Sequence, residues 1–493
     1  MKLQITILII FITLHLTTPQ IPTKNHLKLP IFNHLNSKFL NIPKPPSNYK
    51  ASPHVTENWI QQQIDQFNPQ DHRTFSQYYS MNDEFFTTGG PIFIFMFMMP
   101  FYSYLGEIYL SYGPIYDVAD DFNATIVFPH HRYFDRSLVF EETTVENLRF
   151  LSINQAIEDL AHLIAHLRSD ESRRDSDIIL VGWDYGASMA TCFAQKYPHL
   201  VTGVWASNGK YNPSFNQPEV VKIVEQQLRA FGSPGCAEKI ENAFNQLEEM
   251  IANNQSNIIR RRFNFCFPIP YQHGDLDIQY LYELLTVHFY GYSLVFDQSY
   301  IEKYSCGTFM NAPVEHDWEA LGYILGLLSL PFPICYPNSF AFQTEIVKEN
   351  IKADWEMAYG RTFLYLECIE YGFFFNSGDG SSIFGSKFPS EFYAHTCEEV
   401  FGITGEQMEL NYQRFTTMHG GRQPVVRNAY YTFGEVNPWI NQGIDKTTID
   451  NSSYYELIPL RSIHTELSLD IDDPHFAEVR RRVYSAIRRW LKH

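Results

Sequence analysis

The sequence predicts an α/β fold, in which helices cover both faces of a mostly parallel sheet and a large helical insertion interrupts the chain. Apolar runs of strand length alternate with amphipathic helical segments through the first 211 residues. From about 212 to 410 the chain is instead helical and aromatic in character, and a strand pattern resumes at 427–433. We therefore expect two separate parts of the chain to build one sheet.

Each expected element has its own signal. Residues 75–80 alternate as an edge strand would, whereas 91–97 and 124–129 are continuous apolar runs suited to central strands. A helix is expected over 152–168, because its apolar residues recur every three or four positions. The remaining expected elements are strands at 177–182 and 201–207, a helix ending at 197, an apolar helix end at 321–330 and a closing helix at 478–491.

A sharp corner lies between the strand at 177–182 and the helix that ends at 197. The aliphatic run breaks at Gly182-Trp183-Asp184-Tyr185-Gly186, and glycines allow the backbone to turn there without a clash. α/β-Hydrolases hold a nucleophile on a strained strand-to-helix turn of this kind. Asp184 stands where a serine hydrolase has serine, so any catalysis depends largely on that carboxylate.

These patterns predict an α/β-hydrolase fold with a large helical, disulfide-containing cap. The expected divisions are a signal peptide at 1–20, an extended N-terminal lead-in at 21–57, the first part of the hydrolase domain at 58–211, the cap insertion at 212–410, and the second part of the hydrolase domain at 411–493.

The charge and the N-terminus limit the possible partners. A formal net charge of −18 argues against nucleic acid, which needs a basic face. Arg480–Arg482 and Arg488-Arg489 fit a solvated face of the closing helix. Lys2 followed by the apolar run 5–16 resembles a secretory signal peptide, with cleavage expected between about Leu16 and Gln20. No second apolar run has the length of a membrane span.

The cysteines and glycosylation sequons also indicate the secretory pathway, secreted or lysosomal. Cys192 is expected to be a buried free thiol, and the other cysteines form an even set of six, for which fifteen pairings are possible. No Cys-x-x-Cys occurs, so no zinc or other metal is expected, and nothing indicates a cofactor. The expected glycan acceptors are Asn123, Asn254 and Asn451.

From residue 58 to the C-terminus the sequence resembles the proline-specific serine carboxypeptidases and dipeptidyl peptidases, the group of lysosomal Pro-X carboxypeptidase and thymus-specific serine protease. The stretches that carry the resemblance are Phe75-Ser76-Gln77-Tyr78-Tyr79, Gly89-Gly90-Pro91-Ile92-Phe93, His131-Arg132-Tyr133-Phe134, 146–152, Gln155-Ala156, the corner at 182–186 with 196–200, Asn437-Pro438-Trp439 and His464.

The resemblance places a serine, aspartate and histidine triad on Asp184, Asn437 and His464, so two of the three members are replaced. It also implies oxyanion-equivalent positions at Tyr185, Phe97 and Met98, and bulky side chains replace the family's glycines at Phe97 and Met98. The disulfide pairings that it implies are Cys236 with Cys306, Cys266 with Cys335, and Cys368 with Cys397.

Three interpretations of this site remain open. The first is a pseudopeptidase that binds proline-containing peptides or an active family relative, and that could form a homodimer. Losing the triad aspartate costs about 10⁴-fold in trypsin and losing the nucleophile costs about 10⁶-fold in subtilisin. The second is a hydrolase that uses Asp184 as a carboxylate nucleophile, with Glu435 or Glu466 supporting the histidine. The third is a serine-type peptidase whose nucleophile is Ser188.

Non-catalytic roles are open as well. Asp184 lies close to the start of a helix, where first-turn amides could stabilise it as a capping carboxylate. Ser188 lies one helical turn past the corner, so its hydroxyl is expected to point along the helix. Without its triad partners, His464 could be an ordinary packed or surface histidine.

Overall fold

The computed structural model describes residues 50–97, 103–295, 298–328, 335–353, 358–463, 465–469 and 473–491. The signal peptide expected over 1–20 lies outside these residues, as does most of the lead-in expected over 21–57. The first strand, β1 (Val55–Gln63), begins inside the stretch expected to be a lead-in.

An eight-stranded sheet organises the described residues, in the order β1-β2-β4-β3-β5-β6-β7-β8. Its other strands are β2 (Thr74–Asn82), β3 (Ile92–Met96), β4 (Thr125–Pro129), β5 (Ile178–Trp183), β6 (Gly203–Ser207), β7 (Ala429–Gly434) and β8 (Tyr454–Ile458). The strands from β4 to β8 pair in parallel, whereas β2 pairs antiparallel with both β1 and β4. A largely parallel sheet with a sharp turn after β5 is the α/β-hydrolase fold that the sequence predicts.

The prediction that 75–80 forms an edge strand is wrong. β1 pairs along the outside of β2 from Val55–Asn82 to Gln63–Thr74, so β1 is the edge strand. The sequence of β1 concealed it, because a polar side chain occupies its inner face. Gln62 is buried, and its side-chain amide donates to Gln77 Oε1 at 2.7 Å and to the carbonyl of Asp159 at 2.9 Å.

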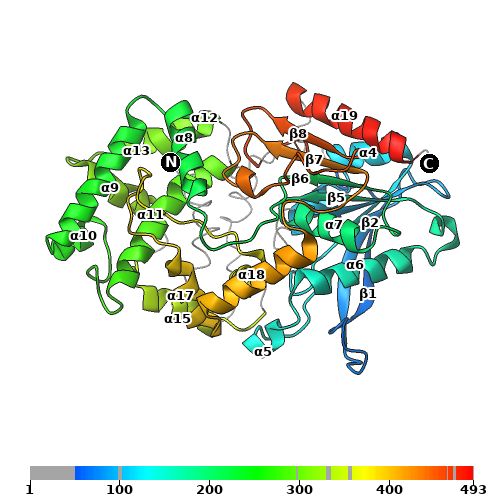
Figure 1. Ribbon diagram of the computed structural model, residues 1–493, viewed down its shortest axis with the longest axis horizontal. Helices are drawn as coiled ribbons and strands as arrows, with labels where there is room; N and C mark the ends of the chain where they lie inside the picture. Colours follow the sequence, from blue (N-terminus) through cyan, green and yellow to red (C-terminus); the bar gives the residue numbers. More distant parts are fainter. Residues whose placement is uncertain are drawn as a thin grey trace.

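Helices cover both faces of the sheet. In Figure 1, α6 (Ile153–Leu167) and α7 (Tyr185–Lys196) lie on one side, and α4 (Pro114–Phe122) and α19 (Pro474–Trp490) lie on the other. The Tyr484 hydroxyl of α19 donates to the carbonyl of Pro114 at 2.9 Å, which joins the last helix to α4. The shorter helices of this part are α3 (Ser103–Ile108), α5 (Val145–Leu148), η2 (Glu171–Arg173) and η5 (Ile440–Gln442).

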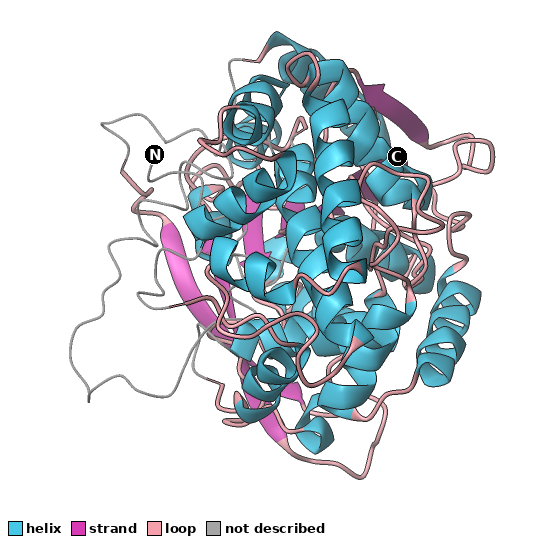
Figure 2. Ribbon diagram, turned by 90° about the vertical axis from the view of Figure 1, so that its left-hand side faces the viewer, coloured by secondary structure: helices cyan, strands magenta, loops and turns pink. Residues whose placement is uncertain are grey.

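The chain between β6 and β7 is helical, and in Figure 2 its helices stand in front of the strands. These helices are α8 (Glu219–Phe231), α9 (Cys236–Ala252), α10 (Ser256–Arg262), α11 (Asp275–Val295), α12 (Gln298–Tyr300), η3 (Ile301–Cys306), α13 (Gly307–Met310), α14 (Asp317–Leu328), α15 (Phe340–Glu349), α16 (Ala358–Leu366), η4 (Glu367–Tyr371), α17 (Glu391–Phe401) and α18 (Gly405–His419).

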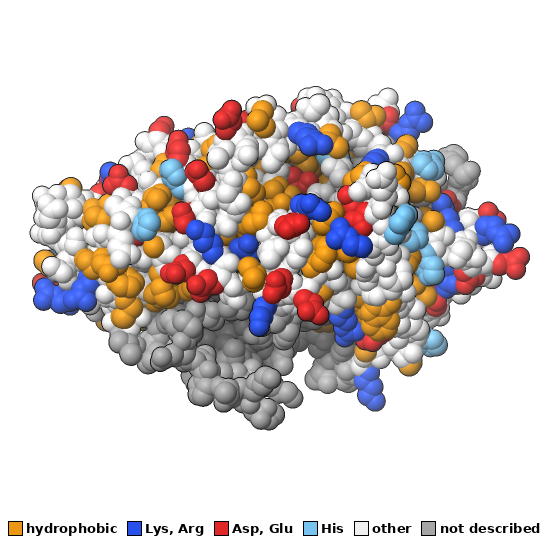
Figure 3. All heavy atoms as spheres, turned by 90° about the horizontal axis from the view of Figure 1, so that it is seen from below, with side chains coloured by type: hydrophobic (Ala, Val, Ile, Leu, Met, Phe, Trp, Pro, Cys, Tyr) orange, Lys and Arg blue, Asp and Glu red, His pale blue; other side chains and the backbone are white. Residues whose placement is uncertain are grey.

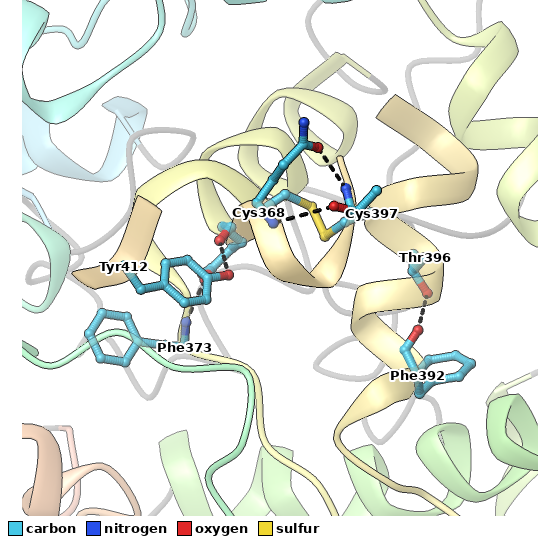
Figure 4. Close-up of a disulfide and its surroundings, with 9 residues drawn as sticks. Cys368, Phe373, Phe392, Thr396, Cys397 and Tyr412 are labelled. Atoms are coloured by element: carbon cyan, nitrogen blue, oxygen red, sulfur yellow. Dashed lines mark hydrogen bonds between the residues drawn. A yellow bond between two sulfur atoms is a disulfide. The ribbon is translucent and has the colours of Figure 1, made fainter. Parts of the chain in front are cut away.

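Three disulfides tie this helical segment together. They join Cys236 to Cys306, Cys266 to Cys335, and Cys368 to Cys397, which are the pairings that the resemblance implies. Figure 4 shows the last of them linking η4 to α17. Cys192 is a buried free thiol.

Helix α18 begins at a capping box. The Thr404 hydroxyl accepts a hydrogen bond from the Gln407 amide at 3.3 Å, and the Thr404 amide donates to Gln407 Oε1 at 2.9 Å. We expect Thr404→Ala to destabilise the first turn by about 1 kcal/mol, which speeds its amide hydrogen exchange about fivefold. Thr404→Ser keeps the hydroxyl and should exchange as the wild type does. Equal exchange in the alanine and serine variants would contradict this role.

The solvated face predicted for the arginines of α19 is wrong for Arg480, which is buried and donates to the carbonyl of Glu466 at 3.3 Å, whereas the other arginines of this helix lie at the surface. Arg481 and Arg482 both contact Glu478, at 2.7 and 2.6 Å.

On the face seen in Figure 3, acidic and basic side chains are interspersed. Across the residues that the structure describes, none of the helices combines the length and apolarity needed to span a membrane.

Candidate functional site

Asp184 occupies the turn between β5 and α7 in a strained backbone conformation, with φ 52° and ψ −112°. Positive φ is uncommon outside glycine and asparagine and is typical of a nucleophile elbow. Two glycines make the turn possible. A Cβ on Gly182 would lie 2.3 Å from the carbonyl oxygen of Gly186, and a Cβ on Gly186 would lie 2.1 Å from that of Met96. The local geometry of an elbow is therefore present, with a carboxylate at its tip.

The partner of the Asp184 carboxylate is Lys210. Lys210 Nζ lies 3.3 Å from Asp184 Oδ1, and the two side chains are only 8% and 9% exposed. The Asp184 side chain makes no capping hydrogen bond to α7. The capping role considered from the sequence is thus replaced by a buried ion pair.

Three aromatic rings enclose the ammonium group of Lys210. Nζ lies 5.2 Å from the ring centre of Tyr371, 5.0 Å from that of Phe373 and 4.9 Å from that of Trp439. Such distances are within the range of cation–π attraction. We call these three rings, from two distant parts of the chain, the aromatic cage.

A second buried carboxyl, Glu367, lies beside the cage. Its Oε2 accepts a hydrogen bond from the Phe373 amide at 2.8 Å, one of the bonds drawn in Figure 4. Burial raises the pKa of Glu367 to about 7, although the positive charge of Lys210 opposes the rise. Burial also raises the pKa of Asp184, again opposed by Lys210. One cation therefore lies among two carboxyls that have little access to water.

Asn437, where the sequence predicts the equivalent of the triad aspartate, is buried and hydrogen-bonded through both ends of its amide. Its Nδ2 donates to Asn208 Oδ1 at 3.0 Å, and its Oδ1 accepts from the Trp439 amide at 2.9 Å. The amide thus holds Trp439, a member of the cage. His464 lies outside the described residues.

The two acids considered as replacement partners are engaged elsewhere. Glu466 is buried, and its Oε1 accepts from Trp205 Nε1 at 2.8 Å and from the Thr432 hydroxyl at 2.6 Å. Glu435 is exposed, and its Oε2 accepts from the Leu460 amide at 3.1 Å.

Ser188 is buried on α7, and its hydroxyl is hydrogen-bonded to the backbone of Lys210. Ser188 Oγ donates to the Lys210 carbonyl at 2.6 Å and accepts from the Lys210 amide at 3.0 Å. This hydroxyl fixes the backbone that carries the Lys210 side chain, which is a structural role for a small residue.

Aromatic side chains occupy the oxyanion-equivalent positions that the structure describes. Phe97 is 6% exposed and packs edge-on against Trp183, with ring centres 5.7 Å apart. The Tyr185 hydroxyl lies 2.9 Å from His131 Nε2, and its ring lies 4.9 Å from that of Tyr371. Met98 lies outside the described residues.

A cavity of about 40 Å³ lies next to the elbow, and its lining includes Phe97, His131, Tyr185 and Met189. No group of metal-binding side chains occurs within the described ranges.

The glycosylation sequons predicted at Asn123, Asn254 and Asn451 all have exposed asparagines.

Sequence reasoning missed the residues that determine this environment: Lys210, Glu367, Tyr371 and Phe373. A signal existed for Lys210, because it follows β6 directly at the carboxyl edge of the sheet, beside the elbow strand. Glu367 and two cage rings come from η4 and the residue pair after it, about 180 positions beyond the elbow, and no local pattern relates them to it.

Two solved structures are similar to this chain over most of its length. Epoxide hydrolase VrEH1 from Vigna radiata is 11% identical, with a TM-score of 0.36 over 88% of this chain and 99% of that one. A bacterial heroin esterase is 9% identical, with a TM-score of 0.37 over 98% and 97% of the two chains.

Among curated proteins, the chain is 25% identical over 437 residues to the lysosomal Pro-X carboxypeptidases of Homo sapiens and Pongo abelii, covering 82% of both chains in each case. It is 23% identical over 421 residues to a probable serine protease of Arabidopsis thaliana, covering 81% of this chain and 78% of that one. The family model of serine carboxypeptidase S28 matches residues 62–479. The chain therefore belongs to the serine carboxypeptidase S28 family.

Proposed function

We propose that this chain is an S28 family member without peptidase activity, a pseudopeptidase that acts by binding. The observation that carries the proposal is the elbow itself, where the Asp184 carboxylate is buried and paired with Lys210. A carboxylate is a poor acyl acceptor, because the anhydride it would form with a peptide acyl group is high in energy. The ion pair also holds Oδ1 of this carboxylate against a positive charge, which lowers its nucleophilicity.

The surroundings of Asp184 also support the proposal. Asn437 supplies no negative charge to stabilise an imidazolium, and its amide is committed to Asn208 and Trp439. Phe97 fills space beside the elbow, where backbone donors would need room to reach an oxyanion. Each of these features weakens a different step of acyl transfer.

The aromatic cage favours a protein-binding role over capture of peptides. Its three rings already enclose the Lys210 ammonium, so a proline ring would have to displace a charged, partnered side chain. Titration with proline-containing peptides should therefore give no measurable binding heat. Saturable binding would show that the cleft accepts peptides and would favour sequestration.

The direct test of inactivity uses the purified secreted protein. We expect no turnover of a proline-specific chromogenic peptide and no labelling by a fluorophosphonate serine probe, because no activated serine is present. Human lysosomal Pro-X carboxypeptidase, assayed in parallel, is the positive control for both reagents.

Two variants identify the nucleophile if activity is found. Labelling that disappears in Ser188→Ala would make Ser188 the nucleophile and refute the pseudopeptidase. Hydrolysis without labelling, abolished in Asp184→Asn, would instead indicate a carboxylate nucleophile. We further propose that the protein resides in the secretory pathway, secreted or lysosomal, which its three disulfides support.

A further inference from the structure

A primary amine and a carboxyl group face each other in the interior of this protein. Lys210 Nζ lies 3.3 Å from Asp184 Oδ1, and neither side chain is more than 9% exposed. The two residues come from different segments, the elbow after β5 and the loop after β6. Ser188 holds the backbone of Lys210 through two hydrogen bonds, which fixes the position from which the amine extends.

The environment of this pair is dry and contains a third acid. The aromatic cage encloses Nζ, and burial disfavours the charged form of the Asp184 carboxyl. Burial is the main cause that raises the pKa of Glu367 to about 7. The charge of Lys210 lowers this pKa and the charge of Asp184 raises it, so Glu367 interacts with both groups. Glu367 can therefore both accept and release a proton near neutral pH.

We propose that Lys210 and Asp184 join through an intramolecular isopeptide bond, with Glu367 as the proton carrier. Proton transfer within the ion pair first converts the ammonium and the carboxylate into an amine and a carboxylic acid. The nitrogen lone pair then attacks Asp184 Cγ and forms the new C–N bond. Glu367 takes a proton from the nitrogen and returns it to a carboxyl oxygen, the C–O bond breaks, and one water molecule leaves. Nothing is oxidised or reduced.

Proximity of the amine and the carboxyl group promotes this condensation. Well-oriented groups held within one molecule react with effective concentrations of about 10⁵–10⁸ M. The burial of the two side chains limits access of the water that would reverse the reaction. The product is an amide, which carries no buried charge and links β5 to the loop after β6.

Tryptic peptide mapping of the purified full-length secreted protein tests the bond directly. Trypsin does not cleave after an acylated lysine, so the cross-linked protein yields one branched species in which peptide 175–196 is joined to peptide 197–222. This species should be lighter by one water than the sum of its two parts, and fragmentation should locate the link at Asp184 and Lys210. Recovery of free 175–196 and free 197–210 in full yield would overturn the proposal.

The peptide map of the wild-type protein tests whether the bond exists. Two variants then test the chemistry by which it forms. Lys210→Arg keeps a cation beside Asp184 but cannot form this amide, so the branched species should disappear. Glu367→Gln preserves the shape of the acid and should slow cross-linking by about a hundredfold in freshly synthesised protein. Unchanged cross-linking in Glu367→Gln would overturn the role given to Glu367. The mass measurement does not depend on any peptidase assay. The isopeptide bond and the proposed lack of activity are therefore tested separately.

Discussion

Replacing Lys210 with methionine is expected to lower the free energy of unfolding by about 3–5 kcal/mol, the usual cost of leaving one member of a buried ion pair without its partner. Methionine fills the cage with a chain of similar length, so little of the loss comes from a cavity. What remains is the Asp184 carboxyl, 9% exposed and without its cation. Denaturant unfolding of both proteins at pH 7 measures the difference, and loss of the proposed cross-link would add to it.

A matched control separates this effect from the change of residue type. Lys222 also pairs with a carboxylate, Glu219 at 3.3 Å, but the two side chains are 36% and 55% exposed. Lys222→Met should therefore cost less than about 1 kcal/mol. Similar losses in the two variants would mean that the burial of the Lys210–Asp184 pair has no energetic consequence.

The double variant Lys210→Met, Asp184→Leu provides a second comparison. Replacing both members of a buried pair by apolar residues removes the unpaired charge, and such replacements are often neutral or stabilising. We expect the double variant to recover part of the stability that Lys210→Met loses. A further loss in the double variant would indicate that Asp184 contributes more than a partner for Lys210.

The sequence predicted the sheet and the elbow well, because both depend on local patterns. Continuous apolar runs predicted β3, β4 and β5, and the pair Gly182 and Gly186 predicted the sharp turn that the backbone makes at Asp184. It failed on the two edge strands, β1 and β8, for which no strand was expected. β1 places Gln62 in the interior through side-chain hydrogen bonds, so its buried face does not look apolar.

The candidate site could be predicted only in part. The replacements predicted at 184 and 437 rest on the sequence, since each position lies in a stretch that resembles a family motif. The cage is not, because Tyr371 and Phe373 belong to a π-helical turn and its exit in the helical insertion, far from the elbow in sequence. Their proximity to Lys210 depends on how the insertion packs over the sheet, which is a tertiary property.

Stability should also fall as the pH rises from about 6.5 to 8. Burial raises the pKa of Glu283 and of Glu370 to about 8, and that of Glu367 to about 7. A carboxyl whose pKa is higher in the folded state stabilises the fold at low pH, and that stabilisation is lost as the pH rises through the folded-state pKa. Each such group contributes about 1.4 kcal/mol per pH unit while it is protonated only in the folded protein. The expected loss across this interval is roughly 4 kcal/mol.

Below about pH 6.5 buried histidines oppose this trend. Burial lowers the pKa of His130, His131 and His419 to about 4, and that of His288 to about 3. A histidine with a lowered pKa contributes stability above its unfolded value of about 6.5, and this contribution is lost as the pH falls. The two groups of residues therefore act in opposite directions between about pH 4.5 and 6.5. We expect maximum stability in this mildly acidic range, measured as the denaturant midpoint from pH 4.5 to 8.

Single carboxyl substitutions test the cause of the alkaline loss. Glu370→Gln keeps an oxygen to accept the hydrogen bond from the Ile153 amide, and Glu283→Gln keeps one for the Tyr393 hydroxyl, but neither side chain titrates. Each should flatten the fall between pH 6.5 and 8 by the contribution of one group, whereas Glu406→Gln, at an exposed position, should leave it unchanged. An unaltered slope in both buried variants would place the pH dependence elsewhere. A flattened slope would show that these buried acids cause the loss of stability at alkaline pH.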